Sequence, residues 1–494
     1  MERSERPSKT RRWAVARLTT GAGAVALAGC GPERGPAAPN ASPGAVTIRY
    51  AFFAIPAEAE LWKRVAAEFG QQSPRVAIEP YHTNPDGEHF QRMAALLAAG
   101  GEPEVMMWTT RHLAAWAIKD TFYPLHDLVK RASRYRKDDI FPTEGNKNVV
   151  RGKALALPFT HAPQVIYYNK ELFARSRLPE PPHRWDDPTW KWHHHLDTAR
   201  RLARRPGPTR DTTVFGYDNG ASWLSAQPFI WSNGGDYLSA DHTRVQIDSP
   251  PVVEAFQWVA QFSLKHWVGP TDDDRKGTPG GTNGLFLAGK LAMFAATASI
   301  APVLAAQGQV PWDVAPMPHQ TAQAWTRNPQ VNLAISRNNG GKKLDHAWLA
   351  IEHLAGEPGQ TALAALHRGA PANKRVAASE AWLAPGASHD WKVFVDAAER
   401  HCHPEHEIVT VADVDRLIGQ AYAELLAGRH SAAQMVAAIK PQLEALVREH
   451  TRLVGPNLCS SAAPVPGATP PAGECAGATP TATTPTDPGG GARP

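Results

Sequence analysis

The sequence predicts an α/β fold divided into two lobes, and three observations lead to this prediction. Strand-like and helix-like segments alternate from residue 46 onward, a pattern typical of parallel sheets covered by helices. Residues 46–455 lie between two segments that are poor in large apolar side chains, and this stretch is longer than one simple core requires. In addition, two strand-like runs meet at Pro158 without a helix between them, which indicates a passage from one sheet to another.

The first part of the chain is predicted to build one lobe. Strands are expected at 46–52, 76–80 and 105–108, and helices at 57–69 and 88–99. Ligands of such sheets bind beyond the carboxyl ends of the strands. Phe53, Trp108 and Arg111 lie at such ends and are therefore candidate ligand residues. The alternatives are core packing for the two aromatic rings and a solvated surface charge for the arginine.

The stretch 153–173 is predicted to connect the two lobes. Small and apolar residues alternate up to Leu157, Pro158 withholds a backbone donor, and residues 165–168 begin a second strand that is rich in β-branched and aromatic side chains. We expect residues 159–161 to form the join, which would act as a hinge beside a cleft. An ordinary edge strand that ends in a proline is the alternative.

The rest of the chain continues the alternation. Helices are expected at 197–205, 252–265, 347–354, 409–427 and 431–453, and strands at 214–217, 310–318 and 331–336. Residues 284–293 match most of a phosphate-binding G-x-x-x-x-G-K loop, but Leu291 stands where Ser or Thr would bind magnesium. We therefore interpret this segment as a packing helix.

The N-terminal residues predict export. Arg11, Arg12 and Arg17 precede an apolar run that is too short to span a bilayer and that ends in Leu-Ala-Gly-Cys at Cys30. This ending resembles the lipobox of bacterial lipoproteins, which implies removal of residues 1–29 and a lipid on Cys30. The alternative is a plain secretory signal with an incidental cysteine. The paired arginines also resemble a twin-arginine export signal.

Charge and composition argue against some classes of partner. The formal net charge is +5, but residues 1–29 carry six basic and two acidic side chains, which leaves +1 for the remainder. A nucleic-acid partner would require a retained basic stripe, and the arginines within 200–205 are better interpreted as a solvated helix face. Residues 30–45 and 456–494 are expected to form a flexible tether and a disordered tail.

Motifs for metal binding or catalysis are weak. Residues 401–407 combine His, Cys and Glu, and we interpret any metal affinity there as incidental. The three histidines at 193–195 are expected at the surface. The sequence contains no G-x-S-x-G elbow and no H-E-x-x-H helix. We therefore expect no cofactor, no metal and no enzymatic activity.

Several segments match, in their order and spacing, the pattern of one protein family. They are 47–53, 103–108, 157–173, 231–236, 286–293, 312–318 and 368–372. Together with Cys30 they resemble the extracellular solute-binding proteins (family 1 type) of bacterial ABC importers, in the class that binds carbohydrates. The resemblance implies a type II periplasmic-binding-protein-like fold, with discontinuous lobes joined by crossover strands around a ligand cleft. Residues 46–159 and 296–356 would form the N-terminal lobe, and 160–295 and 357–455 the C-terminal lobe.

The resemblance also implies where the ligand binds. A sugar has apolar C–H faces and a rim of hydroxyl groups, so its site needs flat rings and fixed polar groups. Phe53 and Trp108 are assigned to stacking, and Arg111 and His161 to hydroxyl contacts. The remaining contacts are implied at Trp223, Gln227, Trp231, Asn233, Thr297, Ser299 and Arg368. Residues 295–299 lack the glycines and the aromatic ring that are common there, so Thr297 and Ser299 are expected to meet hydroxyl groups instead.

The resemblance predicts a monomeric, lipid-anchored receptor that captures a sugar or oligosaccharide and delivers it to an ABC permease without catalysis. Its expected partners are the ligand, the permease and, through Cys30, the membrane. Three alternatives stay open. One is a secreted carbohydrate-active hydrolase, and another is a receptor for an anionic solute that is not a sugar, since Arg111, Arg368 and His161 also suit an anion. A lipoprotein that scaffolds other surface proteins through its tail is a third.

Overall fold

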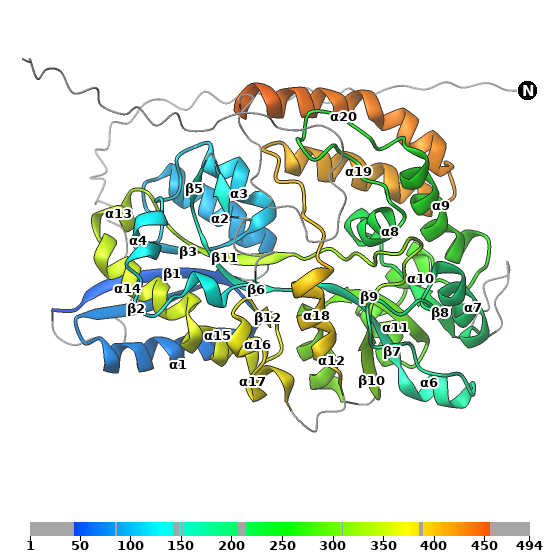
Figure 1. Ribbon diagram of the computed structural model, residues 1–494, viewed down its shortest axis with the longest axis horizontal. Coiled ribbons are helices and arrows are strands. Elements are labelled where there is room, and N and C mark those ends of the chain that lie inside the picture. The colour runs from blue at the N-terminus through cyan, green and yellow to red at the C-terminus, as the bar shows by residue number, and fades with distance from the viewer. Residues whose placement is uncertain are drawn as a thin grey trace, which may run out of the picture. The chain divides into compact units, whose positions relative to one another are not determined.

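Two separate sheets, joined by segments that pass from one to the other, organise the chain (Figure 1). The computed structural model describes residues 44–83, 86–141, 148–150, 152–204, 214–308, 310–384 and 389–454. All of these residues belong to one compact unit. The predicted signal segment, Cys30 and the predicted tail lie outside the described residues.

The first sheet has six strands, and the three that come from the first part of the chain pair in parallel at one side of it, as the sequence predicts. β1 pairs in parallel with β2 and β3, whereas β11 runs antiparallel to β3 and β6, and β12 runs antiparallel to β6. The order across the sheet is β12 (Ala370–Pro371), β6 (Leu157–His161), β11 (Gln330–Ile335), β3 (Val105–Thr109), β1 (Val46–Phe53) and β2 (Val76–Thr83).

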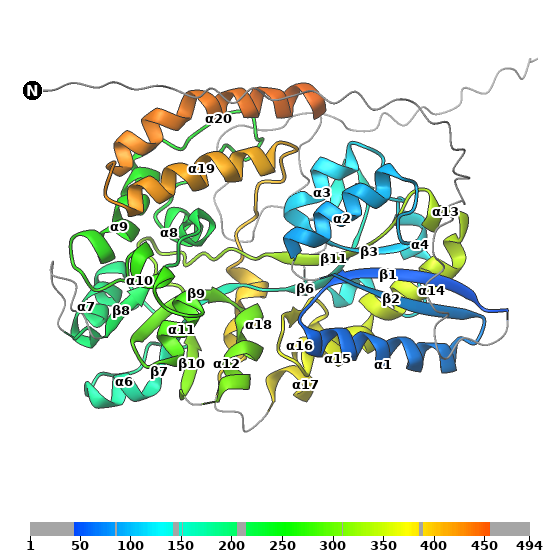
Figure 2. The ribbon, with the colours of Figure 1, turned by 180° about the vertical axis from the view of Figure 1, so that it is seen from behind.

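Helices cover both faces of this sheet (Figure 2). One face packs with α1 (Pro56–Gln72), α14 (Leu344–Ala355) and α15 (Glu357–Ala364), and the opposite face with α2 (Asp86–Ala98) and α3 (Thr110–Ala117). Helix α1 begins with proline at its first position, where no backbone donor is needed, and buries Leu61, Val65 and Phe69 at four-residue spacing. The strands and helices predicted for this part of the chain are confirmed, with small shifts at their ends.

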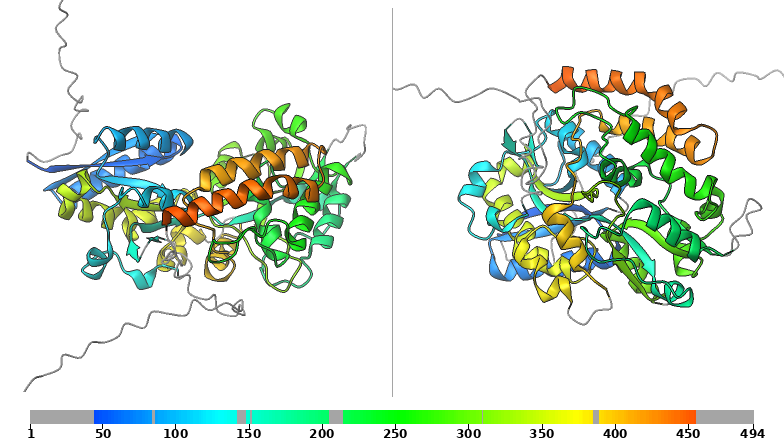
Figure 3. Two further views of the ribbon diagram at one scale, coloured as in Figure 1. Left: turned by 90° about the horizontal axis from the view of Figure 1, so that it is seen from above. Right: turned by 45° about the vertical axis from the view of Figure 1, so that its right-hand side comes forward.

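The second sheet has four strands and the largest apolar cluster of the described residues. Its order is β10 (Trp312–Ala315), β7 (Gln164–Asn169), β9 (Leu291–Thr297) and β8 (Phe215–Asp218). The cluster is built with α7 (Trp192–Leu202), α8 (Gln227–Ser232), α9 (Pro250–Leu264), α11 (Gly281–Leu287), α18 (Lys392–Arg400), α19 (Val411–Leu426) and α20 (Ala432–Val454). Helices α19 and α20 run side by side (Figure 3).

The remaining elements are short. They are α4 (His126–Lys130), η1 (Lys137–Asp139), β4 (Val149–Val150), β5 (Lys153–Ala154), α6 (Lys170–Arg175), η2 (Trp223–Ala226), α10 (Asp272–Lys276), η3 (Ala298–Ile300), α12 (Ala301–Gln307), α13 (Asn339–Lys342), α16 (Lys374–Ala377) and α17 (Glu380–Leu383). The packing helix predicted at 284–293 is instead the end of α11 and the start of β9, with Gly289 at φ 67° between them. Among the helices described, none is both long enough and apolar enough to cross a membrane.

The first passage between the sheets lies directly after residues 159–161, where the join was expected; these residues are still part of β6. Pro158 is part of β6, opposite Asn332, where the register of β6 and β11 shifts by a bulge. A bulge tolerates a residue without a backbone donor, so the proline does not end the strand. The chain crosses to the second sheet at residues 162–163, between β6 and β7.

The second passage also differs from the division that was expected at residue 296. β9 continues to Thr297, and β10 pairs with β7, so both stay in the second sheet. The chain returns to the first sheet only at Gln330, where β11 begins. After residue 357 it is still in the first lobe, because Leu363 of α15 belongs to the core of the first sheet and β12 pairs with β6.

Candidate functional site

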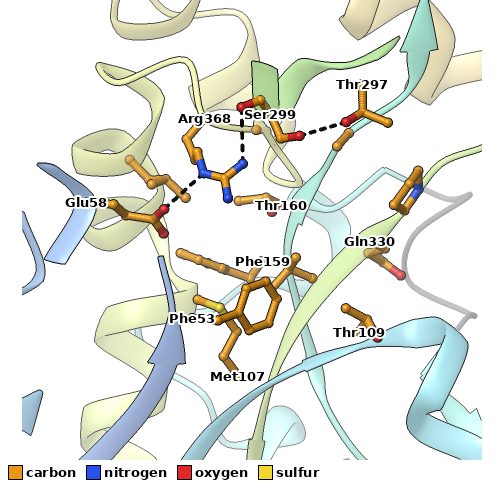
Figure 4. A pocket seen from close by; sticks show the side chains of 15 residues that line it. Phe53, Glu58, Met107, Thr109, Phe159, Thr160, Thr297, Ser299, Gln330 and Arg368 are labelled. Carbon is orange, nitrogen blue, oxygen red and sulfur yellow. Dashed lines mark hydrogen bonds and ion pairs between the residues drawn. The ribbon is translucent and has the colours of Figure 1, made fainter. Parts of the chain in front are cut away.

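A pocket of about 170 Å³ lies where the two sheets are joined (Figure 4). Both passages contribute to it, through Ala162 on the first and Pro329 on the second. The other lining residues are Phe53, Glu58, Met107, Thr109, Phe159, Thr160, Thr297, Ser299, Gln330, Val331, Leu363, Arg368 and Gly369. The pocket is smaller than the roughly 300–1,000 Å³ of sites for drug-sized ligands, so its size suits one sugar ring or a smaller polar solute.

Arg368 and Glu58 form the charged wall of the pocket, as Figure 4 shows. Arg368 Nη1 donates to the carbonyl oxygen of Ser299 at 3.2 Å, and Arg368 Nε lies 3.3 Å from Glu58 Oε2. The other carboxylate oxygen of Glu58 accepts from Trp62 Nε1 at 3.3 Å. Burial raises the pKa of Glu58, although the charge of Arg368 and the indole donor act in the opposite direction.

The hydroxyl wall comes from the end of β9. Thr297 Oγ1 and Ser299 Oγ lie 2.8 Å apart, and the hydroxyl group of Tyr167 donates to the carbonyl oxygen of Thr297 at 3.2 Å. Ser299 also accepts Arg368 through its carbonyl oxygen, so the β9 end in the second lobe is bonded directly to a loop of the first lobe. These two hydroxyl groups are placed to exchange hydrogen bonds with a polar solute.

The floor of the pocket is partly aromatic and partly polar. The ring of Phe53 projects into the pocket from the end of β1, and Phe159 packs against Trp62 with ring centroids 5.4 Å apart. Gln330 is held on one side, because its Oε1 accepts from Thr110 Oγ1 at 2.7 Å. Rings and fixed polar groups in one small space are the combination that a hydroxylated solute requires.

Strand alternation separates Trp108 from the pocket. Met107 and Thr109 line the pocket, whereas Trp108, between them on β3, points to the opposite face of the sheet. There it is fully buried and meets the rings of Phe90 and Trp116, with centroids 5.2 and 5.4 Å away. The structure therefore places Trp108 in the core and not at the stacking position predicted for it.

Arg111 and Trp223 belong to a buried charged cluster between the lobes. Both nitrogens Nε and Nη2 of Arg111 donate to the carboxylate of Asp415 on α19, with Nε at 2.7 Å. Trp223 Nε1 also donates to Asp415, at 3.2 Å, and the guanidinium of Arg111 lies 5.6 Å from the Trp223 ring centroid. Glu405 lies 3.8 Å from Arg111 and 3.7 Å from Arg327. We call these five residues the Arg111 cluster.

Burial and the neighbouring charges shift the pKa values of the two arginines in the cluster in opposite directions. Burial opposes the charge of Arg111, but the hydrogen bonds to Asp415 and the nearby carboxylates outweigh it and raise the pKa of Arg111. Burial and the like charge of Arg111 lower the pKa of Arg327, against the attraction of Glu405. The protein's own carboxylates therefore take the contacts that were predicted for a ligand.

The other predicted site residues lie away from the pocket. His161 is fully buried on β6 beside the ring of Phe141, and Trp231 is stacked on His403 with centroids 4.3 Å apart. Asn233 donates to the carbonyl oxygen of Pro251. The buried side-chain amide of Gln227 has no hydrogen-bond partner within the described part of the chain. Of the predicted set, the structure gathers Phe53, Thr297, Ser299 and Arg368 around one pocket.

Three polar residues of the pocket lining were not predicted from the sequence: Glu58, Thr109 and Gln330. Glu58 stands in the first turn of α1, where an acidic residue is expected for helix stability alone, so its sequence position carried no signal of binding. Thr109 was detectable, because alternation puts it opposite Trp108 at the end of the same strand. Gln330 was missed because the second passage was expected some 30 residues too early, as the bounds of β9 and β11 show.

Within the described ranges, no group of three or more His, Cys, Asp or Glu side chains is arranged to hold a metal ion.

Two α/β lobes, joined by crossing strands around a pocket, define the class of the periplasmic-binding-protein-like folds. The sequence profile of the family described as bacterial extracellular solute-binding protein matches residues 55–361, more than half of the chain. The chain belongs to this family.

Known proteins resemble the chain in part of the sequence and in most of the fold. The sn-glycerol-3-phosphate-binding periplasmic protein UgpB of Escherichia coli (strain K12) is 31% identical over 145 residues, which cover 26% of this chain and 32% of that protein. The match thus spans about a third of the length of this relative.

Solved structures show the same fold at low sequence identity. The ABC substrate-binding protein Lmo0181 from Listeria monocytogenes, in complex with cycloalternan, has a TM-score of 0.70 at 17% identity, covering 83% of this chain and 99% of that chain. UgpB from Mycobacterium tuberculosis, in complex with glycerophosphocholine, has a TM-score of 0.70 at 16% identity, covering 82% of this chain and 99% of that chain. Maltose-bound MalE3 of T. maritima has a TM-score of 0.66 at 19% identity, covering 81% and 100%.

Proposed function

We propose that this protein captures a sugar, or one end of an oligosaccharide, in the pocket at the junction of its two lobes. The observation that carries the proposal is the lining of this pocket. The Phe53 ring suits an apolar sugar face, and Thr297, Ser299 and Arg368 suit its hydroxyl groups. The pocket contains residues of both lobes, so a solute in it would hold the two lobes together.

We further propose that the protein delivers its solute to an ABC permease and leaves the solute chemically unchanged. Membership of the extracellular solute-binding family supports this role, and so do the ligands of two structural neighbours, cycloalternan in Lmo0181 and maltose in MalE3. Lipid attachment at Cys30 after export, by the general secretory or the twin-arginine route, and action as a monomer remain parts of this proposal.

A second candidate ligand is an anionic polyol such as a glycerol phosphate. Two observations favour it: a guanidinium lies in the pocket, and two of the relatives above are named for binding glycerol 3-phosphate or are bound to glycerophosphocholine. Phosphate is a good partner for an arginine fork. The charge of the whole pocket, and not Arg368 alone, decides between the two candidates.

The test is thermal unfolding of the chain from Cys30 onward, with mono-, di- and oligosaccharides, polyols and their phosphate esters. A solute at about a hundred times its dissociation constant stabilises the folded state by roughly 2.7 kcal/mol and raises Tm by a few degrees. The proposal expects a shift with at least one of these solutes and its recovery unchanged by chromatography. Conversion of the solute would favour a hydrolase, and no shift with any of them would refute the proposed solute class.

A further inference from the structure

The charge balance of the pocket identifies the class of solute more narrowly than its size does. Of the lining residues, Glu58 and Arg368 are the two with acidic or basic side chains, so the lining carries no net charge when both are ionised. The two groups face each other with 3.3 Å between Arg368 Nε and Glu58 Oε2. A solute that enters this pocket therefore meets a guanidinium, that of Arg368, which is already paired with the Glu58 carboxylate.

Glu58 is held in place by three independent features. Its helix starts at Pro56, which fixes the first turn of α1. Its Oε1 accepts from Trp62 Nε1, and Trp62 is itself fully buried. The residue is 3% exposed, so its carboxylate is packed within the protein and is not directed to solvent.

Arg368 retains the capacity to bind a neutral solute. Its Nε faces Glu58 as an ion pair without an aligned hydrogen bond, and this buried nitrogen has no hydrogen-bond partner in the described structure. The guanidinium has five N–H donors, of which the carbonyl oxygen of Ser299 takes one. The donors of the two terminal nitrogens that Ser299 does not take remain for hydroxyl oxygens of a solute. A hydroxyl oxygen can accept from them although Glu58 neutralises the charge of the guanidinium.

We propose that Glu58 is a specificity-determining residue, whose carboxylate neutralises Arg368 so that the pocket accepts an uncharged hydroxylated solute and rejects the phosphate ester of the same solute. This inference rests on the proposed function of the pocket as the solute site. An uncharged solute leaves the Glu58–Arg368 pair intact. A phosphate group would either compete with Glu58 for Arg368 or lie beside a second negative charge that is buried.

The experiment is isothermal titration of the mature chain with two matched pairs of probes: glucose with glucose 6-phosphate, and glycerol with sn-glycerol 3-phosphate. Wild type and Glu58→Gln are compared at pH 7.5, where the esters are dianions. Gln keeps an acceptor for Trp62 and removes the charge. The control is Glu60→Gln, because Glu60 lies in the same turn of α1 but is exposed and paired with Lys63.

We expect Glu58→Gln to bind the phosphate esters at least about tenfold more tightly than wild type, since like charges in one site disfavour binding strongly. The uncharged probes should change by less than a factor of about three, and Glu60→Gln should match wild type. Adding Arg368→Gln to Glu58→Gln should abolish the gain, because the gain acts through the guanidinium.

Three results separate this inference from the proposed function. A wild type that binds a phosphate ester more tightly than its uncharged partner overturns the inference, and this result needs no variant that might fail to fold. An absence of gain in a folded Glu58→Gln protein overturns it as well. If wild type binds neither uncharged probe but Glu58→Gln gains the esters, the role of Glu58 stands, while the proposal that the pocket takes these solutes fails.

Discussion

The pocket around Arg368 and the Arg111 cluster use the same residue type in opposite ways. Each arginine comes from the first lobe and reaches a group of the second lobe, a backbone carbonyl oxygen for Arg368 and the carboxylate of Asp415 for Arg111. Space remains beside Arg368, whereas the side chains of Asp415, Glu405 and Trp223 fill the space around Arg111. The difference teaches that a cation between two lobes is available to a solute only where the chain leaves space and donors beside it: Glu58 takes one side of Arg368, whereas Arg111 is enclosed by its partners.

The largest effect is expected at Trp108, one strand position from the pocket. Trp108→Ala removes a fully buried indole and should lower the free energy of unfolding by about 3–5 kcal/mol, because the core cannot refill the space. Urea denaturation measures this change. The folded variant should keep its solute affinity. The control is Trp267→Ala, since Trp267 is 40% exposed, and its loss should cost less than about 1 kcal/mol.

A contradiction would be a stable Trp108→Ala protein that no longer binds solute. Trp108 would then be a stacking residue, and the division of β3 into a pocket face and a core face would be wrong.

The next effect is expected within the Arg111 cluster. Asp415→Ala leaves a buried guanidinium and the Trp223 indole without their shared acceptor, and should cost about 3 kcal/mol, the lower end for a buried pair, because Asp415 is 25% exposed. Chemical denaturation checks this value. Asp413→Ala is the matched control, because it breaks an exposed pair with Arg416 on the same helix and should cost at most about 1 kcal/mol. Equal effects of the two variants would show that the cluster does not hold the lobes together.

Acid should destabilise the core of the second lobe through His195. Burial lowers the pKa of His195 to about 3, and its ring nitrogens have no hydrogen-bond partner among the described residues. The unfolded chain takes up this proton below about pH 6.5 and the folded chain only near pH 3, so stability falls as the pH drops between these values.

His195→Gln removes this titration. The loss of stability between pH 7 and pH 5 should then be smaller than in wild type by about 2 kcal/mol, measured by denaturation at both pH values. The control is His193→Gln, because His193 is exposed on the same helix and should leave the pH dependence unchanged. An unchanged pH dependence in His195→Gln would mean that this ring is already protonated or accessible in the folded state.

The smallest effect on stability is expected at the hydroxyl wall. Ser299→Ala removes a group whose Oγ bonds to Thr297 and should change the free energy of unfolding by about 1 kcal/mol or less. Solute affinity should nevertheless fall roughly tenfold, since a lost hydrogen bond to a solute costs about 1–1.5 kcal/mol. Thr451→Ala removes a comparable hydroxyl from α20, far from the pocket lining, and should leave affinity unchanged. The same affinity in both variants would remove Ser299 from the site.

Much of the fold could be predicted from the sequence, because alternation and helical spacing act over short distances. Strand β1, helix α1 and helix α9 lie where these patterns place them. Both passages were predicted at the wrong residues, because sheet membership depends on pairing between strands that are distant in the sequence. β10 is bounded by prolines and is as apolar as a strand of the first sheet, and only its pairing with β7 assigns it to the second.

The site was less predictable, for the same physical reason. Asp415 and Arg111 are 304 positions apart in sequence, so no local pattern indicates that the Arg111 guanidinium is already bonded to a carboxylate of the chain. The three histidines at 193–195 were expected at the surface, yet His195 is fully buried while His193 and His194 are exposed. A helix turns by more than a quarter circle at each residue, so three consecutive positions span more than half of its circumference and do not all face solvent.

The central claim is that solute binds at Arg368 and not at Arg111, and the most direct measurement makes the same substitution at both positions. Arg368→Gln and Arg111→Gln are titrated calorimetrically with the solute that gives the largest thermal shift in wild type. We predict that Arg368→Gln weakens binding at least about tenfold with a small change in Tm, whereas folded Arg111→Gln binds like wild type but unfolds at a much lower Tm. The reverse result, normal binding without Arg368 and lost binding without Arg111, would contradict the account.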